Sequence, residues 1–189
     1  NELIYDLIQH PYFQRLRRIS QMGLSYLVYP GATHTRFHHA LGCMHLMQKA
    51  IEVLRFKQVQ ISDDEQNALF MLQLISSQLD MDRMDYLKRD SFYTGVNEGN
   101  INSERLIQMM NVVDDVLVIE EKGIYSVEKF LMARRLMYWQ AYLHKTSLVA
   151  ELILTKILKR AKELTQKGVE LPCSEPLHYF LKNKVELTN

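Results

Sequence analysis

The most informative stretch of the sequence is Asp82-Arg83-Met84-Asp85-Tyr86-Leu87-Lys88-Arg89-Asp90. Four-residue steps on an α-helix return to nearly the same side. Asp82, Arg83, Tyr86 and Asp90 therefore fall within an arc of roughly 100°. Two carboxylates, a guanidinium and a phenol would then meet on one small surface. An ordinary solvent-exposed helix face would explain the charged residues but not the tyrosine. A site that binds a metal, a phosphate and a sugar would explain all four groups.

The overall composition predicts one globular domain spanning residues 1–189. The chain is 47% hydrophobic and carries 23 basic and 22 acidic residues, for a net charge of +1. This balance gives no electrostatic reason to expect nucleic-acid binding or a membrane surface. Cys43 and Cys173 show neither a metal-type spacing nor a disulfide framework, so we expect a reducing, cytoplasmic location. No apolar run reaches the roughly 18 residues of a membrane span.

The low content of glycine and proline predicts a mainly α fold with one small β-hairpin. Only 7 Gly and 4 Pro interrupt the chain. We expect helices over about 11–23, 35–56, from Ser62 onward, 75–89, from Ser103 onward, and 127–165. The hairpin is predicted to pair residues 116–119 with 124–126 around Gly123. In the last helix, Leu148, Leu154 and Leu158 widen the apolar side, which predicts burial on more than one side.

A second polar cluster lies at the start of the helix predicted from residue 35. Arg36 and His39 are three residues apart and share a side near the helix N-terminus, which favours anions. A neutral imidazole is the commonest metal ligand. For a histidine considered alone, a surface or capping role is the stronger interpretation. One His and one Asp do not suffice for a catalytic metal, which usually has three or more protein ligands.

A third cluster lies on the long helix predicted from residue 127. Arg134, Tyr138 and Tyr142 follow one another at four-residue steps and share one face. An arginine fork can hold phosphate oxygens, and tyrosine rings can stack on a base or bracket a sugar. The alternative is an arginine packed over aromatic rings on an ordinary helix.

Together these clusters resemble the HD-domain deoxynucleoside triphosphate triphosphohydrolases. The resemblance is carried by Phe13-Gln14-Arg15-Leu16-Arg17, Gln21-Met22-Gly23, the run from Tyr29-Pro30-Gly31 through His39-Ala40-Leu41-Gly42, the run from Asp82 to Asp90, and Arg134 with Tyr142-Leu143-His144-Lys145. It covers most of residues 1–160. It implies an HD-domain helical bundle that uses a divalent metal to hydrolyse deoxynucleoside triphosphates into deoxynucleoside and inorganic triphosphate.

The resemblance also implies the site residues by position. His39 and Asp82 would be metal ligands. Arg36 and Arg83 would be catalytic, because cations placed in advance stabilise charge that develops on phosphate. The implied substrate-binding residues are Gln21, Met22, Arg36, Arg83, Tyr86, Asp90, Arg134, Tyr138 and Tyr142.

Several of these positions have particular implied roles at the sugar. Asp90 would accept a hydrogen bond from the 3′-hydroxyl. Tyr142 would pack against C2′ and exclude a 2′-hydroxyl by its bulk. Tyr138 departs from the histidine often found at its position in the family, and Arg83 replaces a frequent lysine.

One defining feature of the family, a His-Asp doublet that supplies two metal ligands, is absent. No histidine occurs between His45 and His144, and only about twenty residues separate Asp63 from Asp82. We expect that this sequence omits a segment near residues 70–73, and further residues at both termini, rather than that the gene has lost them. The Cα atoms flanking the junction should then lie much farther apart than about 3.8 Å. The site would be metal-free in such a structure, and Mn, Mg, Fe, Co and Zn all remain open.

The resemblance implies regulation and assembly as well. Gln14 and Arg17 match a regulatory nucleotide site, but Gln9 replaces the acidic residue with which animal relatives read guanine. The alternative is a solvated basic turn. A homo-oligomer, dimer or tetramer, is expected by resemblance only. Two other functions stay open: hydrolysis of another nucleotide or phosphate ester, and nucleotide binding by a catalytically degenerate HD protein.

Overall fold

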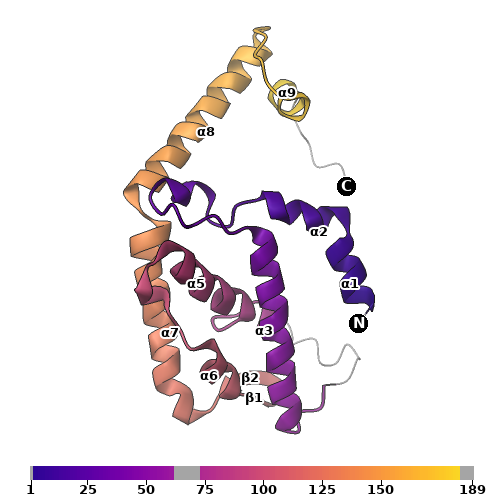
Figure 1. Ribbon diagram of the computed structural model, residues 1–189, viewed down its shortest axis with the longest axis vertical. Helices are drawn as coiled ribbons and strands as arrows, with labels where there is room; N and C mark the ends of the chain where they lie inside the picture. Colours follow the sequence, from indigo (N-terminus) through magenta and orange to yellow (C-terminus); the bar gives the residue numbers. More distant parts are fainter. Residues whose placement is uncertain (1, 62–72, 184–189) are drawn as a thin grey trace. The chain divides into compact units, whose positions relative to one another are not determined.

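The computed structural model describes residues 2–61 and 73–183 (Figure 1). The chain divides into two compact units, Asn1–His144 and Lys145–Asn189, and each is described by itself. The single domain expected over residues 1–189 stays a prediction. The discontinuity expected near residues 70–73 and the helix start expected at Ser62 fall outside the described residues.

The first unit is mainly helical with one two-stranded antiparallel sheet, as predicted. Its main elements are α1 (Glu2–Gln9), α2 (Pro11–Arg15), α3 (Arg36–Phe56), α5 (Met81–Thr94), α6 (Ser103–Gln108), β1 (Met110–Val113), β2 (Val116–Ile119), α7 (Ile124–Met137) and a π-helix over Tyr138–Tyr142. Short 3₁₀ turns occupy Leu16–Arg18, Gly23–Leu27, Asn97–Gly99 and Glu121–Gly123.

The core of this unit forms where α5 packs between α3 and α7 (Figure 1). Each helix contributes apolar residues at three- and four-residue spacing, which places them on one side. The buried residues are Leu46, Ala50 and Leu54 of α3, Met81, Met84 and Leu87 of α5, and Phe130, Ala133 and Met137 of α7. This packing matters for function, because it holds the polar residues of α3 and α5 beside one another.

Helix α5 begins later and ends later than the predicted range of 75–89. Asp80 is its N-cap and accepts hydrogen bonds from the backbone N–H of Arg83 at 2.7 Å and of Ser77 at 3.0 Å. This capping starts the helix at Met81. At the other end Gly95 adopts the left-handed conformation, with φ 75°, and ends the helix after Thr94.

The helix predicted over 11–23 is wrong beyond its first turns. Helix α2 ends at Arg15, and Ile19 is extended, with φ −109° and ψ 113°. The reason is tertiary pairing: the N–H of Gln21 bonds to the carbonyl of His34 at 3.0 Å, and the N–H of Arg36 bonds to that of Ile19 at 2.9 Å. By contrast, the predicted start of α3 at Thr35 and Arg36 is confirmed, with His38 Nδ1 accepting from the Thr35 N–H.

The hairpin exists, but its partner strands differ from the prediction. Strand β2 occupies the predicted residues 116–119. Its partner is β1, which precedes it in the sequence, and not residues 124–126, which follow it. Asp114 and Asp115 form the turn with φ of 51° and 59°, the left-handed pair that a type I′ hairpin requires. Gly123, which suggested the other turn, lies in a 3₁₀ turn that leads into α7.

The single helix predicted over 127–165 is interrupted. Helix α7 runs into the π-helix, and Leu143, with φ −102° and ψ 22°, ends it before α8 (Lys145–Gln166) begins. No Gly or Pro marks this break in the sequence. The π-helix is a wider turn of a kind that often occurs at functional sites.

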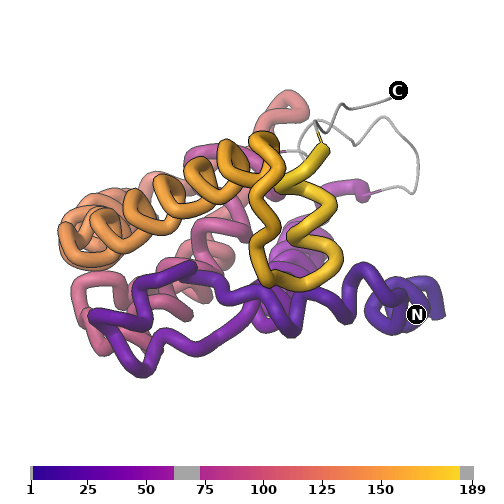
Figure 2. The backbone as a smooth tube through the Cα atoms, turned by 90° about the horizontal axis from the view of Figure 1, so that it is seen from above, coloured from indigo at the N-terminus to yellow at the C-terminus, as the bar shows by residue number. Residues whose placement is uncertain are grey.

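The second unit pairs α8 with α9 (Glu175–Lys182), which folds back alongside it (Figure 2). Burial of α8 on several sides was predicted, and this is wrong. Six of its large apolar side chains are 40% to 62% exposed: Val149, Leu152, Ile153, Leu154, Ile157 and Leu158. No helix in the described ranges has both the length and the apolar character needed to cross a membrane.

Candidate metal and substrate site

The centre of the site is His39, whose ring lies between two carboxylates. His39 Nε2 is 2.8 Å from Asp82 Oδ1, and Nδ1 is 2.8 Å from Asp85 Oδ2. His39 comes from the first turn of α3, and both aspartates come from the first turns of α5. The two carboxylates differ in environment, since the Asp82 side chain is 53% exposed and that of Asp85 only 7%.

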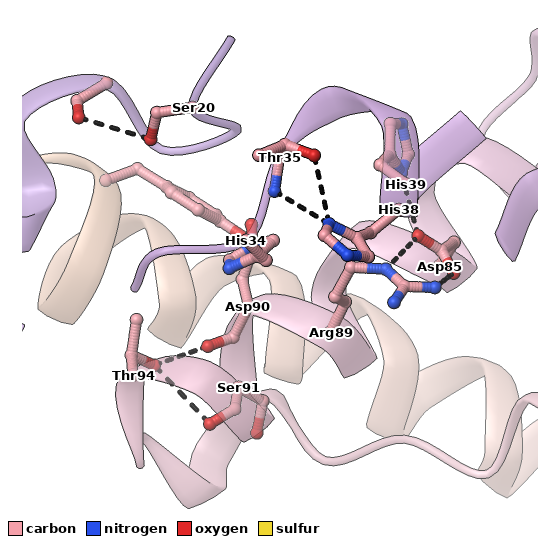
Figure 3. A network of polar contacts seen from close by, with 12 residues as sticks. Ser20, His34, Thr35, His38, His39, Asp85, Arg89, Asp90, Ser91 and Thr94 are labelled. Carbon is pink, nitrogen blue, oxygen red and sulfur yellow. Dashed lines mark hydrogen bonds and ion pairs between the residues drawn. The ribbon is translucent and has the colours of Figure 1, made fainter. Parts of the chain in front are cut away.

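Asp85 is fixed in turn by an arginine one turn further along α5. Arg89 donates from Nε to Asp85 Oδ2 at 2.8 Å and from a terminal nitrogen to Oδ1 at 2.6 Å (Figure 3). This two-point contact is the strong, directional form of an Arg–carboxylate pair. His39, Asp85 and Arg89 therefore form a continuous polar chain.

The protonation states of His39 and Asp85 follow from the contacts of their side chains. Burial lowers the pKa of His39, but hydrogen bonds with Asp85, Cys43 and Asp82 outweigh burial and raise it to about 10. Burial raises the pKa of Asp85, and its bonds with His39 and Arg89 reverse this and hold the pKa below its usual value. Without an ion, the His39 ring is therefore a cation at neutral pH, and metal binding must displace a proton.

The donor atoms around His39 fit a divalent ion in part. His39 Nε2 and an Asp82 oxygen face each other, and Cys43 Sγ lies 3.6 Å from the same nitrogen. His39, Cys43 and Asp85 also bring one donor atom each within 4.8 Å of one another. Burial raises the pKa of Cys43, which keeps its thiol protonated at neutral pH. His39 and Asp82 thus supply two ligands where a catalytic ion usually has at least three from protein.

A cavity of about 340 Å³ opens beside Asp82. Its lining residues are Cys43, Met44 and Met47 of α3, Met81 and Asp82 of α5, and Ile75. Asp82 therefore borders open space, as a ligand of an exchangeable ion would need to.

Three tyrosines connect His39 with Arg134. The ring of Tyr86 lies edge-on to His39, with centroids 6.4 Å apart, and edge-on to Tyr142 at 5.9 Å. Tyr142 meets Tyr138 at 5.1 Å, and the Arg134 guanidinium lies 6.0 Å from the Tyr138 ring. Burial, together with the neighbouring Tyr138, raises the pKa of Tyr86 to about 12, so this phenol stays neutral. These ring contacts therefore link the stretch from Asp82 to Asp90 and the third predicted cluster with His39.

Asp90 is buried, and each of its two carboxylate oxygens has a side-chain partner. His34 Nε2 is 2.6 Å from Asp90 Oδ1, and the Tyr142 hydroxyl donates to Oδ2 at 2.8 Å. The His34 and Asp90 side chains are 0% and 3% exposed. Burial and the Asp90 carboxylate raise the pKa of Tyr142, so its hydroxyl remains a donor. The expected contact of Asp90 with a sugar hydroxyl has to share these oxygens with His34 and Tyr142.

The predicted arginines have different settings. Arg83 contacts the Asp80 carboxylate and donates to the carbonyl of Ser77, so it is partly used in holding the start of α5. Arg134 donates to Gln78 Oε1 at 3.1 Å. Arg36 is exposed at the first position of α3. Among these three arginines, Arg36 alone has a guanidinium with no hydrogen-bond or ion-pair partner in the described part of the chain.

The remaining predicted positions lie near the N-terminal segment. Met22 is buried in the core, and Gln21 Oε1 is a buried acceptor with no partner among the described residues. Gln14 and Arg17 contact each other at 2.7 Å, and the Arg17 guanidinium lies 3.6 Å from the Phe37 ring. Arg17 is exposed to solvent and also packs on an aromatic ring.

Sequence reasoning missed four residues of this site. Asp85, Arg89, His34 and Cys43 were not assigned roles, although three of them lie inside the stretches that drew attention. A four-residue spacing between Asp85 and Arg89 signals an ion pair, and between His39 and Cys43 a shared helix side. No local signal pairs His34 with Asp90, because 56 residues separate them.

Comparison with known proteins places this geometry in a family. Residues 101–171 match the model of the HD associated region. A crystal structure of a phosphohydrolase from Bacteroides thetaiotaomicron shares 46% sequence identity and a TM-score of 0.91, over 96% of this chain and 61% of that chain. These matches support the assignment of the chain to the HD-domain phosphohydrolase superfamily.

Curated relatives extend the same superfamily assignment. YwfO of Bacillus subtilis, named as uncharacterised, is 33% identical over 247 residues, covering 95% of this chain and 57% of that protein. The deoxynucleoside triphosphate triphosphohydrolase SAMHD1 homologue of Dictyostelium discoideum is 22% identical over 250 residues, covering 90% and 48%. The chain thus spans about half the length of these relatives. Both alignments are longer than the 189 residues of this chain, so each relative carries residues within the matched region that this sequence lacks.

Proposed function

We propose that the chain forms the substrate and metal site of a divalent-metal-dependent hydrolase that converts deoxynucleoside triphosphates into deoxynucleoside and inorganic triphosphate. The observation that carries the proposal is the 2.8 Å approach of His39 Nε2 to Asp82 Oδ1, with a cavity beside it and tyrosines adjoining it. The relative from Dictyostelium, whose name specifies this reaction, supports the choice of substrate.

His39 and Asp82 are proposed to hold the ion. Such an ion, when bound, activates water and neutralises charge on phosphate oxygens. His39 must first give up its Nε2 proton, while its Nδ1 proton remains with Asp85. The ligands still needed are those that a His-Asp doublet would provide, and the longer alignments of the relatives are consistent with residues absent from this sequence.

The arginines and tyrosines are proposed to hold the nucleotide. Arg134, and Arg36 at the positive end of α3, would bind the triphosphate, and Arg83 would join them by releasing Ser77 or Asp80. The Tyr142 ring, fixed through its hydroxyl to buried Asp90, would form a rigid wall against the sugar. A rigid wall can reject a 2′-hydroxyl by bulk, which is the basis for the preference for deoxyribose.

A second candidate function is nucleotide binding without hydrolysis. The absence of any histidine between His45 and His144 favours it, because a chain with only two ligands would hold an ion weakly. Hydrolysis of another nucleotide or phosphate ester is the third possibility that the site accommodates. The regulatory nucleotide at Gln14 and Arg17, the homo-oligomer and the cytoplasmic location stay predictions.

Product analysis separates these functions. The purified protein would be incubated with each deoxynucleoside triphosphate and Mn²⁺, Mg²⁺, Fe²⁺, Co²⁺ or Zn²⁺, and the inorganic products separated by ion chromatography. Inorganic triphosphate supports the proposal. Pyrophosphate or orthophosphate indicates the other hydrolase, and nucleotide binding with no product indicates the degenerate protein.

The role of Arg134 has a matched control on the same helix. Arg134→Ala should reduce turnover at least about 100-fold, the scale of removing one preorganised donor to phosphate charge. Arg135→Ala should leave turnover unchanged, because Arg135 is exposed and stacks on Trp139, with its guanidinium 4.6 Å from the ring. Equal kinetics of the two variants would remove Arg134 from the site.

A further inference from the structure

The two carboxylates that touch His39 are suited to different tasks. Asp82 is half exposed and borders a cavity, whereas Asp85 is buried and already satisfied by Arg89. A metal-binding histidine commonly donates its second ring N–H to a carboxylate, which fixes the tautomer and the orientation of the ring. Asp85 meets this description at Nδ1, and Asp82 then belongs to the ligand side at Nε2.

Arg89 holds Asp85 in the required direction. Both oxygens of Asp85 accept from Arg89, and Oδ2 also lies 2.8 Å from His39 Nδ1. The carboxylate therefore cannot rotate away from His39 without breaking a two-point contact. Asp85 in turn raises the pKa of Arg89, which keeps the pair ionised.

The backbone of α3 is adapted to this pair at Gly42. A Cβ atom built on Gly42 would lie 1.8 Å from Asp85 Oδ1 and 2.2 Å from a terminal nitrogen of Arg89. Any larger residue would push the pair away from α3, and so away from His39 one turn earlier. Gly42 is therefore required by the close approach of these two side chains.

We propose that Asp85 and Arg89 act as positioning residues, which hold the His39 ring so that Nδ1 donates to Asp85 and Nε2 is presented to the divalent ion. This inference rests on the proposed metal site and goes beyond it, because it assigns roles to residues outside the ligand set. It predicts that changes at Asp85, Arg89 or Gly42 weaken ion binding although none of these residues needs to touch the ion.

The surroundings of Arg89 allow chemical rescue. Arg89 lines a cavity of about 550 Å³ together with Asp85, Lys88, His45 and Phe92. Replacing Arg89 with alanine would enlarge this cavity next to Asp85, which already lines it. A free guanidinium ion could then bind Asp85 in place of the missing side chain.

Ion affinity measured by calorimetry with Mn²⁺ provides the main test. Asp85→Asn, Arg89→Ala and Gly42→Ala should each weaken binding about 10- to 100-fold, the usual effect of removing an outer partner of a ligating histidine. Millimolar guanidinium should restore affinity to Arg89→Ala but not to Asp85→Asn. Lys88→Ala, the exposed neighbour on α5, should bind as wild type does. Unchanged affinity in all three variants would overturn the proposal.

A second measurement keeps the inference separate from the proposed function. In metal-free wild type, the His39 Nδ1 proton held by Asp85 should give a low-field proton resonance that is slow to exchange and is absent in His39→Ala. This resonance should disappear in Arg89→Ala and return with guanidinium. If wild type binds no ion, the proposed metal site fails, but the resonance still tests the positioning pair. Persistence of the resonance in Arg89→Ala and in Asp85→Asn would refute it.

Discussion

The first unit contains two histidine–aspartate clusters that join the start of α3 to α5, and they differ in access to solvent. His34 and Asp90 are sealed in the interior, stacked against Tyr93 and completed by Tyr142. His39 stands between one buried and one exposed carboxylate. The same two residue types thus form a structural anchor in one place and an exchangeable site in the other. Burial, rather than residue type, separates the two roles.

The largest expected effect is on the closed cluster. His34→Ala should lower the free energy of unfolding by about 3–5 kcal/mol, because it leaves the buried Asp90 carboxylate without one of its partners. Urea denaturation of the variant measures this. His45→Ala, on the exposed side of α3, is the control and should change the free energy by less than about 0.5 kcal/mol. Equal stability of the two variants would show that the closed cluster is not an anchor.

The next effect is on the open cluster and concerns activity rather than stability. Asp82→Asn should reduce metal-dependent turnover by more than about 100-fold, because even outer partners of metal ligands contribute 10- to 100-fold. Its free energy of unfolding should stay close to that of wild type, since Asp82 is half exposed. Steady-state kinetics and urea denaturation of one preparation test both statements. Full activity of this variant would contradict the assignment of Asp82 as a ligand.

A smaller effect separates two tyrosines of the same π-helix. Tyr142→Phe removes the hydroxyl that donates to buried Asp90 and should cost about 1.5–3 kcal/mol of unfolding free energy, the range for hydrogen bonds to charged groups. Tyr138→Phe should cost much less, because Tyr138 is 41% exposed. Thermal or urea unfolding distinguishes them. Similar losses would mean that the Tyr142 hydroxyl does not stabilise the closed cluster.

The smallest effect, when expressed per pH unit, is a dependence of stability on pH. The pKa of His39 rises from 6.5 to about 10 on folding, so its stabilisation is complete below pH 6.5 and is lost as pH rises toward 10. The slope should not exceed about 1.4 kcal/mol per pH unit. Metal-free wild type should therefore lose more stability between pH 7 and 9 than His39→Gln does, as measured by urea unfolding in the presence of a chelator. Parallel pH profiles would argue against this protonated state.

The sequence-based expectations succeeded where the signal was local. Thr35 and Arg36 begin α3 as predicted, because capping depends on neighbouring residues. The hairpin prediction chose Gly123 over Asp114 and Asp115, because aspartate is a weaker indicator of positive φ than glycine. The break between α7 and α8 has no Gly or Pro to announce it.

Grouping residues on one side of α5 brought Asp82, Tyr86 and Asp90 together correctly, but could not say which would be buried. The structure places Asp90 in the interior and Asp82 at a cavity, although both lie on the same helix. Their depth depends on what packs over each end of α5, namely Tyr142 in one case and open space in the other. Such packing partners are distant in sequence and leave no periodic pattern.

The amino-acid sequence by itself determined the helical character of the chain, the membership suggested by its motifs, and the inclusion of His39, Asp82 and Arg134 in one proposed site. Only the tertiary structure decided that Asp85, held by Arg89, contacts His39 and that His34 contacts buried Asp90. It also decided that α8 leaves its apolar residues exposed. Local rules govern caps and helix faces, because they act between residues a few positions apart. Depth, pairing and proton affinity arise from contacts made across the fold, and they exist only once the helices have packed.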